Sequence, residues 1–106
     1  MFLKLCAFVV VFGVMTNCFA YTSDTGKVSR VYTSPSGAIA FQIVGGFKKA
    51  DESGECENNN GWAGLVETDS FLKSLILAAK LSGQSVTVAL EGCQGSWIKI
   101  KDIYLN

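Results

Sequence analysis

The stretch LILAAKLSGQSVTV, from Leu75 to Val88, carries the change of pattern that decides the fold. Its first part is apolar with the period of a helix, a glycine follows, and its last part alternates as a strand does. Gly83 suits the left-handed cap that ends many helices. The stretch therefore predicts a helix over residues 69–82 that leads directly into a strand.

The predicted helix has more apolar side chains than one buried face needs. Thr68 or Asp69 can cap its N-terminus. The face with helical period consists of Phe71, Leu72, Leu75, Ile76 and Ala79. Leu77 and Leu81 lie off that face, near Lys73. Either a neighbouring subunit covers them, which makes Lys73, Leu77 and Leu81 candidate interface residues of a homo-oligomer, or one core wraps widely around the helix.

Short strands are predicted on both sides of the helix, because β-branched and aromatic residues recur between turn signals. Tyr21 to Thr25 is expected to fray. Residues 45–61 are polar and rich in glycine and asparagine, and they predict a loop that allows a short strand at residues 46–49. The predicted strands span residues 26–34, 37–44, 62–67, 84–91 and 96–105.

The last predicted strand contains a change of phase. Its apolar residues alternate up to Ile100 and resume in the opposite phase at Ile103. A β-bulge adds one residue and resets the alternation, so we expect a bulge near Lys101 and Asp102. Before this strand, the Gly-Cys-Gln-Gly sequence over residues 92–95 predicts a turn.

The element order indicates the fold class. The predicted order is strand, strand, loop, strand, helix, strand, strand. This order favours an α+β fold that is mainly β. The specific prediction is a small OB-like, partly open barrel of about five strands, with one α-helix between the third and fourth strands.

The N-terminal residues, up to Ala20, predict a secretory signal peptide. Lys4 supplies the positive charge, residues 5–15 the apolar core, and Ala20 the cleavage site. The alternative is a retained membrane anchor, but the apolar stretch is too short to span a bilayer. Lipidation of Cys18 is disfavoured, since the residues just before it are not small. We therefore expect a single domain over residues 21–106 that is periplasmic or secreted, with no membrane insertion of the mature chain.

Two cysteines stay in the mature chain, Cys56 and Cys93, because Cys6 and Cys18 leave with the signal peptide. An even count in an exported chain predicts a disulfide. The loop it closes is worth about 4 kcal/mol in the chain-entropy estimate. Two buried thiols or two metal ligands are the alternatives, but a cysteine pair without histidine makes a poor zinc site.

The composition excludes several classes of function. The mature charge is close to balance, which argues against a nucleic-acid partner. The chain has no histidine, so the commonest general base and metal ligand are missing. The residues of one acidic loop could form a glycosidase pair or bind calcium, but their spacing matches no EF-hand, and a solvated turn is favoured for Asp51, Glu52, Glu55 and Glu57. We expect no enzyme activity, no cofactor and no metal.

The candidate ligand-binding residues are two tryptophans and three residues in or next to one turn. Trp62 follows an Asn-Asn-Asn-Gly turn, and Trp97 opens the last strand. Exposed indole rings there would suit stacking on a sugar, while the alternative is that both pack over the barrel ends near the disulfide. Tyr32, Ser34 and Ser36 form a hydroxyl-rich turn that could bind a glycan or be only a turn.

The chain resembles small exported, largely uncharacterised proteins of Gram-negative bacteria. The residues that carry this resemblance are Val28, Val31, Tyr32, Phe41, Cys56, Leu75 to Gly83, Val86, Val88 and Cys93. The stretch FLKSLILAAKLSGQSVTVALEGC, residues 71–93, is also similar to the B subunits of subtilase-type cytotoxins. That likeness implies an OB-fold pentamer that binds sialylated glycans, and it transfers no site residue.

We therefore expect an exported, non-enzymatic binding module. Its favoured form is an oligomer that binds a glycan or protein receptor, similar to a toxin B subunit. The alternative is a monomeric periplasmic protein that inhibits or assists an enzyme such as a cell-wall hydrolase. Export, small size and one disulfide suit both.

Overall fold

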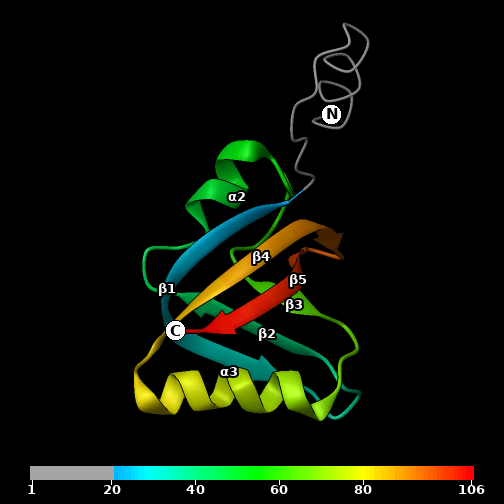
Figure 1. Ribbon diagram of the computed structural model, residues 1–106. Coiled ribbons are helices and arrows are strands. Elements are labelled where there is room, and N and C mark those ends of the chain that lie inside the picture. The colour runs from blue at the N-terminus through cyan, green and yellow to red at the C-terminus, as the bar shows by residue number, and fades with distance from the viewer. Residues whose placement is uncertain (1–20) are drawn as a thin grey trace, which may run out of the picture.

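The computed structural model describes residues 21–106, so the predicted signal peptide lies outside the described residues. The described chain is α+β and consists mostly of strands (Figure 1). The strands are β1 (Thr22–Thr33), β2 (Ile39–Ile43), β3 (Ala63–Leu65), β4 (Ser85–Gln94) and β5 (Trp97–Leu105), and the helices are α2 (Lys48–Ser53) and α3 (Ser70–Ser82).

The five strands form one sheet in the order β1-β2-β3-β5-β4, and β4 pairs with β1 again. The N-terminal half of β1 pairs with β4 and its C-terminal half with β2. The register shifts between Val28 and Arg30, where β1 passes from one partner to the other. The β3–β5 pair is parallel and the other pairs are antiparallel.

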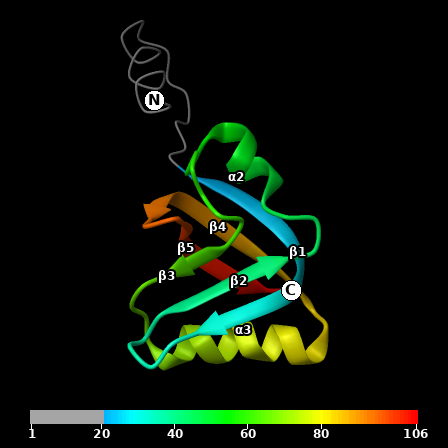
Figure 2. The ribbon, with the colours of Figure 1, turned by 180° about the vertical axis from the view of Figure 1, so that it is seen from behind.

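The core lies inside this curved sheet and is closed at its two ends by the helices. Figures 1 and 2 show α2 at one end and α3 at the other. In α3, Ile76 and Ala79 are fully buried. Near α2, the ring of Phe47 packs edge-on against Phe41, with 5.8 Å between centroids. The largest fully buried side chains are Phe41, Ile39, Ile76, Leu90, Ile98, Val86 and Val88.

The helix expected over residues 69–82 is confirmed. Asp69 accepts the Leu72 N–H at 3.0 Å and caps α3, and Gly83 ends it with φ +74°. The predicted buried face is wrong at Phe71, whose surface is 77% exposed. Phe71 lies in the first turn of α3, at the opening of a cavity between α3 and β5, so the core covers little of its ring.

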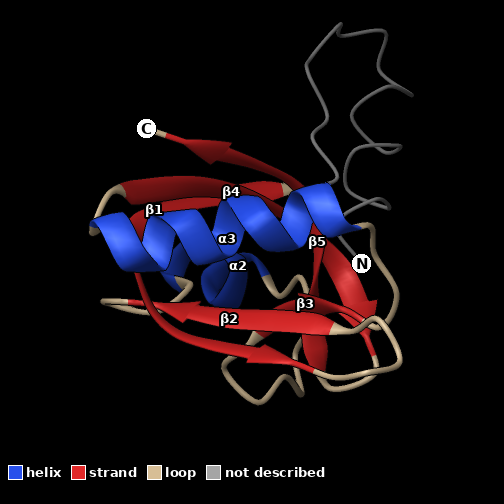
Figure 3. Ribbon diagram, turned by 90° about the horizontal axis from the view of Figure 1, so that it is seen from below, coloured by secondary structure: helices blue, strands red, loops and turns tan. Residues whose placement is uncertain are grey.

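The idea of one core wrapped widely around α3 is also wrong. Leu77 is 51% exposed and Leu81 is 78% exposed, because both point away from the sheet. Figure 3 shows α3 lying across the end of the sheet, with its outer side uncovered by any other element of residues 21–106.

The expectations for Tyr21 to Thr25 and for residues 45–61 need correction. β1 begins at Thr22, and its first residues pair with β4 instead of fraying. Residues 46–49 form no strand, and α2 makes a second helix where only one was expected. Asp24, buried in β1, accepts the N–H groups of Lys49 and Ala50 at 2.9 and 3.1 Å and so caps α2.

The bulge predicted in the last strand is confirmed. Ala89 pairs with Asp102 and Leu90 pairs with Ile100, which leaves Lys101 as the extra residue. The predicted turn over residues 92–95 is shifted, because β4 continues to Gln94 and the chain reverses at residues 95–96. Within residues 21–106, neither helix has the length and apolar character needed to cross a bilayer.

Candidate functional site: an aromatic surface beside the disulfide

Three aromatic rings and one guanidinium group gather on the outer face of the sheet. The rings of Tyr32 and Trp97 meet at 64°, with 5.8 Å between their centroids. The guanidinium carbon of Arg30 lies 5.1 Å from the ring centroid of Trp62, a cation–π contact. We call Arg30, Tyr32, Trp62 and Trp97 the aromatic surface.

Strand alternation and register bring these residues to one face. Arg30 and Tyr32 are two residues apart on β1, so their side chains point to the same side of the sheet. Ala63 pairs with Ile98 in the parallel β3–β5 ladder, so the residues just before them, Trp62 and Trp97, are neighbours. The predicted ligand-binding residues Tyr32, Trp62 and Trp97 therefore share one surface.

Small residues on the neighbouring strands make room for the rings. Tyr32 pairs with Ala40, and Ala40 pairs with Gly64. A Cβ atom on Gly64 would lie 2.6 Å from Trp97 Cε3 and 2.6 Å from the Ile39 carbonyl oxygen. The indole of Trp97 thus lies directly on the backbone of β3, and only glycine fits beneath it.

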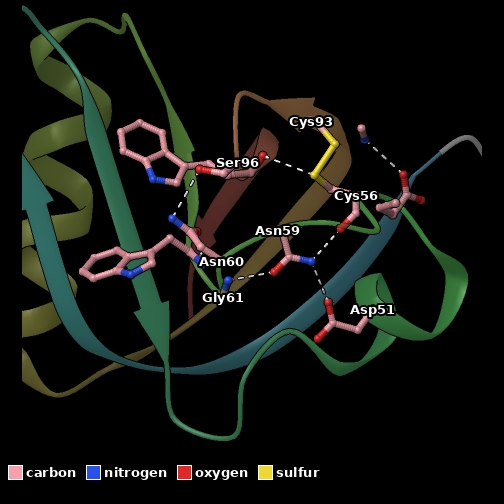
Figure 4. The surroundings of a disulfide bond; sticks show 11 residues. Asp51, Cys56, Asn59, Asn60, Gly61, Cys93 and Ser96 are labelled. Atoms are coloured by element: carbon pink, nitrogen blue, oxygen red, sulfur yellow. Dashed lines mark hydrogen bonds between the residues drawn. A yellow bond between two sulfur atoms is a disulfide. The ribbon is translucent and has the colours of Figure 1, made fainter.

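The disulfide between Cys56 and Cys93 is confirmed, with 5.1 Å between the two Cα atoms. It joins the loop after α2 to the end of β4. Figure 4 shows it beside the β4–β5 hairpin, where Cys56 Sγ lies 3.7 Å from the Trp97 carbonyl oxygen. The disulfide therefore ties together the two segments that carry Trp62 and Trp97.

The asparagines before Trp62 are used inside the loop. Asn59 donates through Nδ2 to the Asp51 carboxylate at 3.0 Å and to the Cys56 carbonyl oxygen, and its Oδ1 accepts the Gly61 N–H (Figure 4). The backbone N–H of Asn60 donates to the Ser96 carbonyl oxygen at 2.9 Å. These bonds position Trp62 and use both N–H groups of the Asn59 side chain.

The acidic residues of the loop contact different partners in the structure. Asp51 binds Asn59, and Glu55 accepts the Gly92 N–H at 3.2 Å. Burial raises the pKa of Glu55, the bond from Gly92 lowers it, and the nearby Glu91 carboxylate raises it further. Residues 21–106 contain no group of three or more acidic or cysteine side chains placed to hold a metal ion.

The remaining predicted site residues lie elsewhere or are already bonded. The hydroxyls of Ser34 and Ser36 are 2.8 Å apart in the β1–β2 turn that follows Tyr32. Lys73, Leu77 and Leu81 lie on α3, and the two leucines are exposed on its outer side. Sequence reasoning missed Arg30, although its place two residues before Tyr32 in a strand was a usable signal.

Charge on the aromatic surface is positive. Within the described part of the chain, Arg30 forms no ion pair, since the ion pair found there joins Lys101 and Asp102.

Comparisons of this chain with protein-family models, with curated proteins and with solved structures found no match. The geometry of this surface is therefore the basis for a functional proposal.

Proposed function

We propose that this protein is an exported, non-enzymatic binding module that recognises a glycan through its aromatic surface. The observation that carries the proposal is the gathering of Tyr32, Trp62 and Trp97 on one outer face. Tyr32 is 45% exposed although it is aromatic. Flat amphipathic rings offer apolar contact area at low conformational cost, which suits the C–H faces of sugars. Arg30 adds a donor at the edge of the same surface.

The architecture supports an OB-like barrel as the scaffold of this module. The strand order β1-β2-β3-β5-β4, with α3 between β3 and β4, agrees with that proposal. OB-folds bind oligosaccharides and oligonucleotides on the face of strands 2 and 3 and with the loops between strands 1 and 2 and between strands 4 and 5. The aromatic surface adjoins β2 and β3, because Tyr32 pairs with Ala40 of β2 and Trp97 packs on Gly64 of β3.

Export and lack of enzyme activity are parts of the same proposal. The Cys56–Cys93 disulfide favours an oxidising compartment such as the periplasm or the medium, and the signal-like segment before Tyr21 agrees with it. The chain has no histidine, and the disulfide takes up both cysteines of residues 21–106.

Assembly into a homo-oligomer is the favoured form of this module, because Leu77 and Leu81 are exposed beside Lys73. Native mass spectrometry of the oxidised residues 21–106 tests this form. A closed ring supports it. A monomer favours the second candidate, a protein that inhibits or assists an enzyme such as a cell-wall hydrolase, and leaves the glycan proposal to its own test.

A glycan array, followed by fluorescence titration of the oligosaccharides that bind, tests the glycan proposal. Trp97→Ala should weaken binding by about tenfold or more, because it removes one ring on which a sugar stacks. Tyr104→Ala is the matched control, since Tyr104 is an exposed aromatic residue of the same strand, outside the aromatic surface. An empty array, or equal binding by Trp97→Ala and wild type, contradicts the proposal.

A further inference from the structure

The C-terminal part of β5 has one edge without a partner strand. Among residues 21–106, β3 pairs with β5 only at Ile98 and Lys99, and beyond them β5 pairs with β4 alone. Figure 3 shows this part of β5 running past α3 to the margin of the molecule. An unpaired strand edge presents N–H and C=O groups to which another extended chain can bind.

The free groups of this edge can be assigned from one hydrogen bond. The Asn106 N–H donates to the Ser85 carbonyl oxygen at 3.0 Å. Hydrogen-bonded and non-bonded pairs alternate along an antiparallel ladder, so Tyr104 also bonds to β4. Ile103 and Leu105 therefore direct their N–H and C=O groups away from β4, toward the open edge.

A cavity of about 280 Å³ adjoins this edge, between β5 and the first half of α3. Its walls are apolar and come from Leu72, Leu75, Ile100 and Ile103. Phe71 also lines it and is mostly exposed, so it stands at the opening. Pockets for drug-sized molecules occupy about 300–1,000 Å³, so this cavity suits an inserted side chain better than a cofactor.

The rim of the cavity carries an excess of negative charge. Its exposed polar residues are Asp69, Lys101 and Asp102. Lys101 Nζ lies 3.0 Å from Asp102 Oδ2, so these two charges neutralise each other. Asp69 caps α3 but pairs with no cation within residues 21–106. A positive group of a partner fits beside it.

We propose that the open edge of β5 and the adjoining cavity bind an extended segment of a partner protein in which an apolar and a basic side chain, two residues apart, face the cavity. The segment adds a strand to β5 through Ile103 and Leu105, places one apolar side chain in the cavity, and brings a lysine or arginine to Asp69. A second copy of β5 fits less well, because its Lys101 is already paired with Asp102 and its Lys99 lies where β5 pairs with β3, so its open part offers Ile103, Tyr104 and Leu105. This surface is separate from the aromatic surface.

Nuclear magnetic resonance of the ¹⁵N-labelled, oxidised protein tests this proposal. In the free protein, the amides of Ile103 and Leu105 should exchange with solvent quickly, while the amide of Tyr104 is protected. The probe is the capped hexapeptide Thr-Val-Thr-Lys-Thr-Val at millimolar concentration, in which the valines and the lysine lie on one face of an added strand. It should shift and protect the two edge amides, and the same peptide with glutamate for lysine should bind about threefold to fivefold more weakly.

Two variants locate the binding. Asp69→Asn keeps a good helix cap but removes the charge, so it should weaken binding of the lysine peptide about threefold and abolish the preference over the glutamate peptide. Leu75→Phe fills the cavity and should reduce binding about tenfold, while Leu77→Phe on the outer side of α3 should change nothing. The amide spectrum of each variant verifies that it is folded.

Three results would overturn the proposal. The first is an absence of shifts at Ile103 and Leu105 with either peptide at millimolar concentration. The second is equal binding by the folded Leu75→Phe variant and wild type. The third is a shift of the same amides on raising the protein concentration without peptide, which would mean that a second copy occupies the edge.

Discussion

α2 and α3 close opposite ends of the same sheet, but contacts of different range hold them. α3 is capped by Asp69, the residue just before it, and ends at the adjacent Gly83. α2 has no cap of its own and takes one from Asp24 on β1, while the nearby loop is fixed by the disulfide to Cys93. The α2 end, with the loop that leads to Trp62, therefore depends on long-range contacts, and the α3 end on local ones.

The largest expected effect comes from removing the long-range covalent contact. Cys56→Ser combined with Cys93→Ser should lower the free energy of unfolding by about 4 kcal/mol, because the unfolded chain gains the freedom of the opened loop. Urea unfolding measures this loss. The tryptophan fluorescence of the native state should change as well, since the disulfide joins the two segments that carry Trp62 and Trp97. A loss below about 1 kcal/mol would mean that other contacts fix the loop.

At the α3 end, burial should decide the effect of each substitution. Ile76→Ala should cost about 3 kcal/mol, because Ile76 is fully buried between α3 and the sheet. Leu77→Ala, the next residue, should cost less than about 0.5 kcal/mol in a monomer because half of its surface is exposed. Chemical denaturation of both variants checks the contrast. A large loss for Leu77→Ala, dependent on protein concentration, would reveal a subunit interface there.

The two caps offer the most direct comparison of the two ends. Asp24→Ala should cost about 2 kcal/mol and expose the first amides of α2 to exchange, because it leaves two N–H groups without acceptors. Asp69→Ala should cost about 1 kcal/mol, as is usual for an exposed N-cap. Hydrogen exchange together with urea unfolding compares them. If Asp69→Ala were the more costly, the contrast between a borrowed and a local cap would fail.

The smallest effect concerns pH and lies at the α2 end. The pKa of Glu55 in the folded protein is raised above 4.5 by burial, so the folded state holds the proton more tightly than the unfolded chain. The contribution of this group to stability should therefore fall as pH rises from 4.5 through the folded pKa. Glu55→Gln keeps the acceptor for Gly92 and should remove this decline. Thermal unfolding at several pH values measures it, and identical profiles for variant and wild type would contradict it.

The features that could be predicted from the sequence are those whose contacts join residues close together in the chain. The α3 boundaries and the bulge at Lys101 could be predicted, since each depends on neighbouring residues. The exposure of Phe71 could not, because the helical period gives the direction of a side chain but not how closely the sheet packs against it. α2 could not be predicted either, because its cap is Asp24, which is distant from it in the chain.

The candidate site divides in the same way. Trp62, Trp97 and Tyr32 could be singled out by residue type, and the pairing of Cys56 with Cys93 by their count. Their assembly into one surface could not be predicted, because it requires the register of the parallel β3–β5 pair and the small residue Gly64 beneath Trp97.

The sequence by itself determined the α+β class, the span and end of α3, the disulfide and the phase change in β5, because periodicity, capping and cysteine count act over short distances or allow a single pairing. The tertiary structure decided which apolar residues stay exposed, which strand caps α2, and which rings meet on the outer face. These depend on strand register and on how far the sheet reaches, and both are properties of contacts between residues distant in the chain.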